Sequence, residues 1–218
     1  MIRQAIVWRH GRTPWNNANR FQGHIDIPLD EVGVAQAAAA AQIICPHDPA
    51  LIVTSDLSRA AQTAQALTSA TGVEAESDTR LREAHAGNWQ GMTHAEIQVA
   101  DADLLRRWRS MVDVRPGTTG ENRTEVGERV GGAIAEHMVR VAPGEVAVFV
   151  THGGAARAAV GHLLRIPPAH WHHLAVMRNC GWAVLEVDDA GEWRLQSYNL
   201  AAVPVADDRA ADLRDAIV

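Results

Sequence analysis

Two histidines in this sequence stand at the ends of short apolar segments, and each is followed by glycine. The two segments read IVWRHG at residues 6–11 and FVTHGG at residues 149–154. An imidazole, whose pKa lies near neutrality, can serve as a nucleophile or as a proton carrier. If both segments are parallel strands, their carboxyl ends share the crevice in which open α/β sheets bind ligands. We therefore expect His10 and His152 to face each other there; two hydrogen-bonded core histidines are the alternative.

A third apolar segment, residues 51–54, leads into Ser55-Asp56-Leu57-Ser58-Arg59. The residues that follow predict a helix, with Ser55 or Asp56 as its cap. The helix macrodipole disfavours a cation near the N-terminus, so Arg59 at this position indicates an anionic partner. Gly153 opens another predicted helix, whose unpaired N–H groups favour the same kind of partner. A solvated surface arginine is the alternative for Arg59.

All 20 basic residues of the 218-residue chain are arginines. Without lysine the chain can form neither a Schiff base with a carbonyl compound or pyridoxal cofactor nor a complete Walker A phosphate loop. Any phosphate must therefore be held by arginine, histidine and backbone N–H groups. The net charge of −6 argues against nucleic acid as a partner, because binding to the phosphate backbone requires a basic face.

The other features of the composition predict neither a metal site nor a membrane segment. Cys45 and Cys180 form neither a disulfide framework nor a metal-binding spacing. The three histidines within residues 170–173 lie too close in sequence to bind one metal ion without other ligands. No apolar run approaches the roughly 18 to 20 residues that span a bilayer. We expect no metal, no cofactor and no membrane partner, and the cytoplasm as the compartment.

Strand and helix signals alternate along the chain, which predicts a single α/β domain over residues 1–218. Strands are expected at 2–8, 51–54, 73–75 and 145–150, with a hairpin at 182–187 and 192–200. Helices are expected at 30–44, 56–70, 93–109, 124–141 and 154–164, and irregular structure at 11–30. Residues 201–218 alternate acidic and basic side chains and are expected to be a C-terminal tail or a short helix.

Five segments resemble, in the same order, the motifs of the histidine phosphatase (phosphoglycerate mutase-like) superfamily. Residues 9–16 resemble its phosphohistidine signature and residues 22–29 its substrate loop. Residues 55–64 resemble its second phosphate-binding arginine motif, residues 81–91 its acid motif and residues 151–154 its second histidine motif. The resemblance implies a three-layer α/β/α sandwich of the phosphoglycerate mutase-like type, with a mixed, mostly parallel sheet of about six strands.

The resemblance also implies a role for each matching residue of the catalytic group. His10 would be the nucleophile that forms a phosphohistidine. Arg9 and Arg59 would bind the phosphoryl oxygens through planar forks that stay charged at every accessible pH. His152, in its cationic form, would add positive charge in the transition state. Glu83 would protonate the leaving oxygen and then deprotonate the attacking water; an ordinary surface carboxylate is the alternative for this residue.

A second group of residues is expected to contact the substrate rather than to react. The resemblance implies Asn16 as a neutral donor to the phosphoryl oxygens. The other expected substrate contacts are Gln22, Gly23, Gly153, Arg20 and His24, with His85, Arg115, Glu121 and Arg123 as further candidates for the rim. A plain surface role is the alternative for each of the rim residues.

A phosphatase fits the sequence better than a mutase. The mutases of this family usually carry a longer insertion before the second histidine, with extra basic and tyrosine residues. Here only 68 residues lie between Glu83 and His152, and none is lysine or tyrosine. A phosphoglycerate mutase, a broad-specificity acid phosphatase and a non-catalytic module that binds phosphorylated ligands are the alternatives.

The substrate is expected to be a small phosphorylated metabolite. Residues 55–57, 78–83 and 88–95 resemble the branch of the family that removes phosphate from a glucosylated phosphoglycerate. This likeness implies a sugar-linked phosphoglycerate as the substrate and a homodimer as the assembly.

Overall fold

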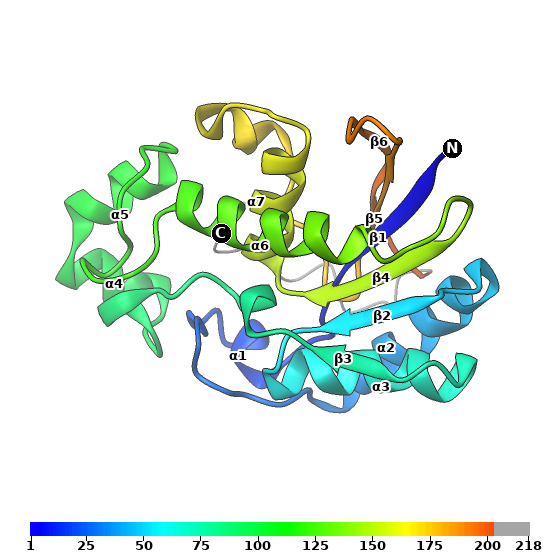
Figure 1. Ribbon diagram of the computed structural model, residues 1–218. Helices are drawn as coiled ribbons and strands as arrows, with labels where there is room; N and C mark the ends of the chain where they lie inside the picture. Colours follow the sequence, from blue (N-terminus) through cyan, green and yellow to red (C-terminus); the bar gives the residue numbers. More distant parts are fainter. Residues whose placement is uncertain (203–218) are drawn as a thin grey trace.

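The computed structural model describes residues 1–202, which form a six-stranded sheet with helices on both faces (Figure 1). In chain order the strands are β1 (Arg3–Arg9), β2 (Leu51–Thr54), β3 (Ala75–Ser77), β4 (Val146–Thr151), β5 (Trp182–Val187) and β6 (Trp193–Leu200). They lie across the sheet in the order β3-β2-β4-β1-β5-β6. The first four in this order are parallel, and β5 is antiparallel to both of its neighbours. The predicted mixed, mostly parallel sheet is thus confirmed.

Seven α-helices and four short 3₁₀ helices occur within the described residues. The α-helices are α1 (Pro14–Asn17), α2 (Glu31–Ile44), α3 (Ser58–Thr71), α4 (His94–Ala100), α5 (Ala102–Arg109), α6 (Arg123–Met138) and α7 (Gly153–Leu163). The 3₁₀ helices are η1 (Cys45–His47), η2 (Thr79–Leu81), η3 (Gly87–Trp89) and η4 (Pro168–His173). No helix of the described residues is long and apolar enough to cross a membrane.

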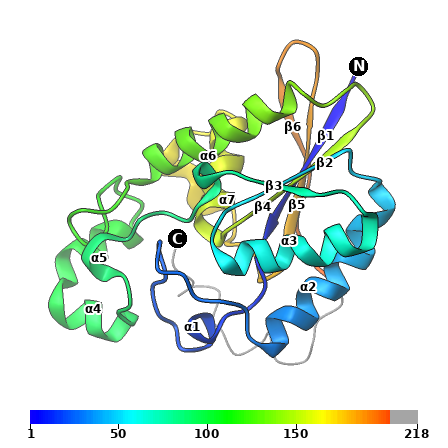
Figure 2. The same ribbon diagram turned by 60° about the horizontal axis from the view of Figure 1, so that its bottom comes forward.

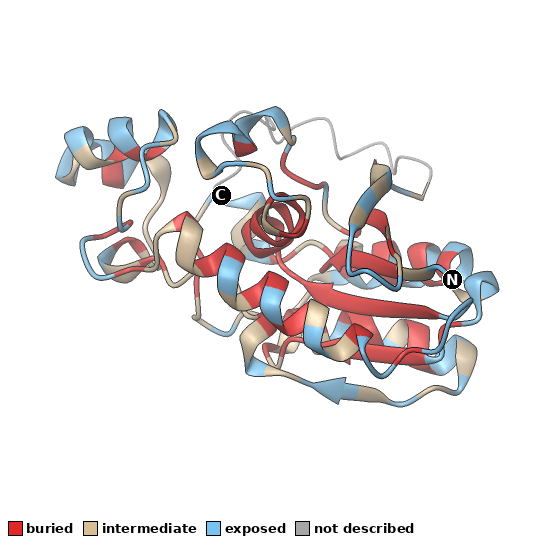
Figure 3. Ribbon diagram, turned by 45° about the horizontal axis from the view of Figure 1, so that its top comes forward, coloured by how far each residue is buried: buried red, intermediate tan, exposed pale blue. Residues whose placement is uncertain are grey.

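Alternate residues of the central strands pack into two separate cores, one on each face of the sheet. In β1, Ala5 and Val7 pack with α6 and α7, whereas Ile6 and Trp8 pack with α2 and α3. This division follows from the pleat, which points successive side chains to opposite faces. Figures 1 and 2 show the two helix pairs on opposite sides of the strands, and Figure 3 shows the buried central strands. The three-layer α/β/α arrangement is therefore confirmed.

A third, smaller core lies under α4 and α5, which extend beyond the carboxyl ends of the parallel strands (Figures 1 and 2). It is made of Phe21, Ala86, Trp89, Ile97, Leu105 and Trp108. The rings of Phe21 and Trp89 meet edge to face, with centroids 5.5 Å apart, and Trp108 lies 6.0 Å from Trp89. Because this core joins the loop after β1 to α5, it forms one wall above the strand ends.

Three predicted elements differ from the structure. The helix expected at 93–109 is two helices, because Asp101 leaves the helical conformation, with φ −153°, and its carboxylate accepts a hydrogen bond from Trp89 Nε1 at 3.2 Å. The third strand lies at Ala75–Ser77 instead of 73–75, in register with residues 52–54 of β2. Residues 11–30 are not wholly irregular, because Thr13 and Asn16 form the capping box of α1. The predicted tail at 201–218 lies outside the described residues, apart from Ala201 and Ala202.

Candidate active site

The two histidines lie side by side at the carboxyl ends of β1 and β4, as the strand pattern predicts. These strands are parallel neighbours, with Arg9 opposite Thr151, and the His10 amide donates to the Thr151 carbonyl at 2.9 Å. The centroids of the His10 and His152 rings are 5.1 Å apart. The pairing of β1 with β4 thus brings together two side chains that are far apart in the sequence.

His10 is held as a neutral imidazole with its Nε2 atom available. Its Nδ1 lies 2.6 Å from the carbonyl oxygen of Gly11, so Nδ1 carries the proton and donates it in this hydrogen bond. Burial above all, and then the charges of Arg59 and Arg9, hold the pKa of His10 well below its usual value. At neutral pH the Nε2 lone pair is therefore free of a proton, which is the state that a nucleophile requires.

His152 is also neutral in the unliganded protein, and its predicted cationic form in the transition state stays a prediction. Complete burial, followed by the charges of nearby groups with Arg59 first, holds the pKa of His152 well below its usual value. Its Nδ1 accepts a hydrogen bond from Arg59 Nε at 3.1 Å, and its Nε2 lies 2.9 Å from Ser55 Oγ. Because Nδ1 accepts, Nε2 carries the ring proton and donates to Ser55. Ser55 is a site neighbour that the sequence analysis treated only as a possible helix cap.

Arg59 lies in the first turn of α3 and is fully buried, in agreement with its predicted place near the strand ends. Besides its bond to His152, it donates to the carbonyls of Ile25 at 2.9 Å and Gly23 at 2.8 Å. A guanidinium has five N–H groups, so these three bonds leave two for a ligand. Burial lowers its pKa to about 10, which keeps the side chain charged at neutral pH.

The start of α3 differs from the prediction, because neither Ser55 nor Asp56 caps it. The helix begins at Ser58, whose amide donates to Asp26 Oδ1 at 2.8 Å. The carboxylate of Asp56 instead pairs with Arg82. The cap of this helix therefore comes from Asp26, in the loop predicted to contact the substrate and 32 residues away in the sequence.

Arg9 approaches from the end of β1 and packs against the first residue of α7. It donates to the carbonyl of Met177. A Cβ atom at Gly153 would lie 3.1 Å from the Cζ and Nε atoms of Arg9, which is too close for an undisturbed contact. Gly153 therefore makes room for the guanidinium, which is how this predicted site residue contributes.

The carboxylate of Glu83 occupies the N-terminus of α7. It accepts hydrogen bonds from the amides of Ala155 at 2.8 Å, Gly154 at 3.1 Å and Ala84 at 2.9 Å. The unpaired N–H groups at the start of this helix thus hold an anion, but in the unliganded protein that anion is Glu83. This contact fixes Glu83 at the same strand ends as His10.

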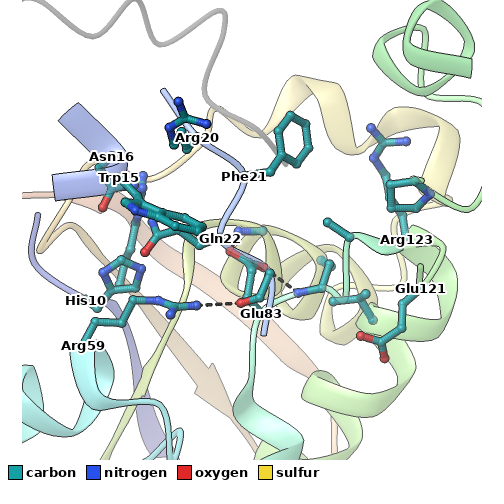
Figure 4. Close-up of a pocket in the computed structure, with 18 of the residues that line it drawn as sticks. His10, Trp15, Asn16, Arg20, Phe21, Gln22, Arg59, Glu83, Glu121 and Arg123 are labelled. Atoms are coloured by element: carbon teal, nitrogen blue, oxygen red, sulfur yellow. Dashed lines mark hydrogen bonds between the residues drawn. The ribbon is translucent and has the colours of Figure 1, made fainter. Parts of the chain in front are cut away.

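Arg9, His10, Arg59 and Glu83 line one pocket that continues towards α5 and α6 (Figure 4), whereas the fully buried His152 lies behind its wall. Of the residues that the sequence analysis proposed, Arg9, His10, Arg59, Glu83, Asn16, Gln22, Gly23, Arg20, Glu121 and Arg123 line it. Figure 4 shows His10 and Arg59 at one end, Arg123 and Glu121 at the other, and Trp15 and Phe21 along the side between them. The pocket therefore has a polar end at the strands and a second end under α5 and α6.

Several predicted site residues lie behind the pocket wall. His24 bonds to the carbonyl of Glu83 at 2.8 Å and stacks edge to face with His85, with ring centroids 5.1 Å apart. Arg115 pairs with Glu125 and donates to the carbonyl of Gly120 at 3.0 Å. Neither His24 nor Arg115 lines the pocket. Both instead bind backbone carbonyls of the surrounding loops.

Some pocket residues carried no sequence signal. The wall includes the apolar side chains of Trp108, Val126 and Ala158, which come from α5, α6 and α7. They belong to no motif, and their helical spacing predicts only a buried face. Within residues 1–202, no three histidine, cysteine, aspartate or glutamate side chains are grouped so that they could hold a metal ion.

A buried neutral imidazole beside two arginines and a carboxylate, at the strand ends of a mostly parallel sheet, defines an enzyme that handles phosphoryl groups. The chain belongs to the histidine phosphatase superfamily (branch 1), whose model matches residues 5–201. The family predicted from the five motifs is thereby confirmed.

Curated relatives include both phosphatases and mutases. The chain is 39% identical over 215 residues to glucosyl-3-phosphoglycerate phosphatase of Mycobacterium tuberculosis, which covers 92% of this chain and 96% of the relative. It is 32% identical over 202 residues to a probable phosphoglycerate mutase of Yersinia pestis, with 89% and 91% covered. A solved structure of mycobacterial glucosyl-3-phosphoglycerate phosphatase with VO3 matches at TM-score 0.85 and 39% identity, with 91% of this chain and all of that one covered.

Proposed function

We propose that this protein hydrolyses a small phosphate monoester through a phosphohistidine on His10. The observation that carries the proposal is the neutral His10 ring, whose Nδ1 proton is bound to Gly11 and whose Nε2 shares a pocket with Arg9, Arg59 and Glu83. The reaction needs a nucleophile, positive charge for the phosphoryl oxygens and a proton carrier. The pocket contains one group for each of these tasks.

The reaction runs in two steps. The substrate binds as a phosphate monoanion and passes its proton to the Glu83 carboxylate. His10 Nε2 then attacks phosphorus, the N–P bond forms, the ester P–O bond breaks, and Glu83 gives this proton to the leaving oxygen. Water then attacks the phosphohistidine while the Glu83 carboxylate takes a proton from it, and the N–P bond breaks to release phosphate. Arg9 and Arg59 hold the phosphoryl oxygens throughout, with Asn16 as a neutral donor. A phosphate dianion beside His152 favours its cationic form, which the unliganded pocket disfavours.

The substrate we propose is a sugar-linked phosphoglycerate such as glucosyl-3-phosphoglycerate. The 39% identity to a phosphatase of that name supports it, as do Gln22, Gly23 and Arg20, the expected substrate contacts, which line the pocket. Phosphoglycerate mutase is the second candidate, favoured by the 32% identity to a probable mutase. A screen of glucosyl-3-phosphoglycerate, 3-phosphoglycerate and phosphoserine separates these substrates, and isomerisation of 3-phosphoglycerate that needs 2,3-bisphosphoglycerate would establish the mutase.

The nucleophile is tested by His10→Ala. We expect the variant to lose at least about a thousandfold in kcat, because no other group in the pocket can form the covalent intermediate. Rapid quench of the wild type with ³²P-labelled substrate should give acid-labile phosphate on His10 and none in the variant. Full turnover by His10→Ala would overturn the proposal.

We also propose a homodimer in the cytoplasm. The dimer rests on the resemblance to the glucosylated-phosphoglycerate branch, and the compartment rests on Cys45 and Cys180, which form no disulfide in the described part of the chain. Light scattering at several protein concentrations tests the dimer, since a monomeric mass at all of them would contradict it.

A further inference from the structure

Arg123 is a buried cation at the end of the pocket opposite His10 and Arg59 (Figure 4). It is the first residue of α6, and only 8% of its surface is exposed. Its guanidinium lies over the Trp108 ring, 4.5 Å from the ring centroid. The side chain is thus held in place and borders the space that a ligand would fill.

The hydrogen bonds of this guanidinium are incomplete. Arg123 donates from Nη2 to the Trp108 carbonyl at 2.7 Å and from Nη1 to the Val112 carbonyl at 3.4 Å. Its Nε is buried and has no hydrogen-bond partner in the part of the chain that the structure describes. No carboxylate among residues 1–202 forms an ion pair with it. Both bonds go to neutral carbonyls, so no carboxylate of the described residues is paired directly with this guanidinium.

Asp113, whose charge favours the cation, uses its carboxylate elsewhere. Its Oδ1 accepts from the amides of Arg123 at 2.9 Å and Thr124 at 3.3 Å, and its Oδ2 accepts from Thr124 Oγ1 at 2.6 Å. Asp113 therefore accepts hydrogen bonds from the first amides of α6 and none from the guanidinium of Arg123. Burial, followed by the nearby charge of Arg157, lowers the pKa of Arg123 to about 10, so Arg123 remains charged at neutral pH.

A buried charge without a partner costs free energy, and an incoming anion removes that cost. The pocket that joins Arg123 to the phosphoryl end is lined in part by the apolar Val126 and Ala158. A ligand that suits the whole pocket therefore carries a phosphoryl group at one end and a second negative group at the other, joined by an uncharged part.

We propose that Arg123 forms a second anion subsite, which binds the carboxylate of the substrate and makes the enzyme select phosphorylated acids. This inference rests on the proposed phosphatase function and deepens it. A glycerate phosphate supplies both groups, with the carboxylate two carbon atoms from the carbon that bears the phosphate. Arg123 is thus a specificity residue, and it takes no part in breaking the phosphate ester.

The test compares two esters that differ in one group. 3-Phosphoglycerate and glycerol 3-phosphate have the same phosphorylated three-carbon chain, but only the first has a carboxylate. We expect wild-type kcat/KM to be roughly 10- to 100-fold higher for 3-phosphoglycerate, the size of a charge-assisted hydrogen bond. Equal values in the wild type would overturn the inference without any variant. Hydrolysis of neither ester and of no glucosyl-3-phosphoglycerate would instead contradict the proposed function.

Arg123→Met removes the charge and keeps an apolar stem to cover Trp108. We expect it to lower kcat/KM for 3-phosphoglycerate mainly through KM, and much more than kcat/KM for glycerol 3-phosphate, which removes the preference. Arg123→Lys should restore part of the preference, because it restores the charge. The control is Arg107→Met on the exposed surface of α5, which should behave as the wild type. A preference that survives in a folded Arg123→Met, or that falls equally in the control, would overturn the inference.

Discussion

At the scale of single residues, the state of His152 explains how the site stays ready for an anion. Both of its ring nitrogens are occupied in the unliganded protein, by Arg59 on one side and Ser55 on the other. The positive charge that faces an incoming phosphate therefore comes from the arginines, whose forks need no proton uptake. Ser55 fixes which nitrogen of His152 carries the proton, as neighbours of reactive imidazoles often do.

Ser55→Ala tests this arrangement. The variant removes the acceptor of the His152 ring proton, and we expect kcat to fall about tenfold while KM changes by less than twofold, since one hydrogen bond in a buried site is lost. Steady-state kinetics on a phosphate ester measure both. The control is Thr68→Ala in α3, whose buried hydroxyl has no hydrogen-bond partner within the described residues. An unchanged kcat in a folded Ser55→Ala would show that the serine does not position the ring.

At the scale of elements, sequence patterns predicted the strands and helices that depend on neighbouring residues. They missed the helix boundaries that depend on contacts with residues far away in the sequence. The strands before His10 and His152 were predictable, because each depends on neighbouring residues. The break at Asp101 depends on Trp89, and the cap of α3 depends on Asp26. No periodicity within either helix encodes those partners, and the same holds for the pocket wall that α5 supplies.

The packing of η4 on α7 depends on a glycine, and a comparison of two helical glycines separates the effect of packing from that of helix propensity. A Cβ at Gly161 of α7 would lie 2.3 Å from Nε1 of the buried Trp171, whereas a Cβ at Gly132 of α6 would meet nothing within 4 Å. We expect Gly161→Ala to lower the free energy of unfolding by about 1–3 kcal/mol through overpacking. Gly132→Ala should raise it by about 0.5–1 kcal/mol, because alanine is the better helix former.

Urea unfolding of both variants at pH 7.5 measures the difference. Equal changes of the same sign in the two proteins would contradict the packing explanation, since propensity alone favours alanine at both positions.

At the scale of the whole molecule, the two buried histidines make stability depend on pH. In the unfolded chain each titrates near 6.5, and in the folded protein burial holds the pKa of His10 and His152 well below that value. Below pH 6.5 the unfolded state therefore binds more protons than the folded state, so the free energy of unfolding falls as pH falls. Each histidine contributes up to about 1.4 kcal/mol per pH unit until its folded pKa is reached.

Urea unfolding at pH 7.5, 6.5 and 5.5 tests this dependence. We expect the stability to change little between the first two values and to fall clearly at 5.5. A His10→Asn, His152→Asn double variant should show a shallower fall, because it no longer has these proton-binding sites. A wild type that is equally stable at pH 7.5 and 5.5 would contradict the neutral, buried state of the rings.

The pairing of β1 has a consequence for how the protein is made. β1 pairs only with β4 and β5 within the described sheet, and their residues, 146–151 and 182–187, are synthesised long after its own. The apolar strand β1 therefore leaves the ribosome before β4 and β5 have been synthesised, and it stays unpaired until they follow. Such late, long-range pairing slows folding and leaves apolar surface open to aggregation, so the nascent chain is a natural client for chaperones.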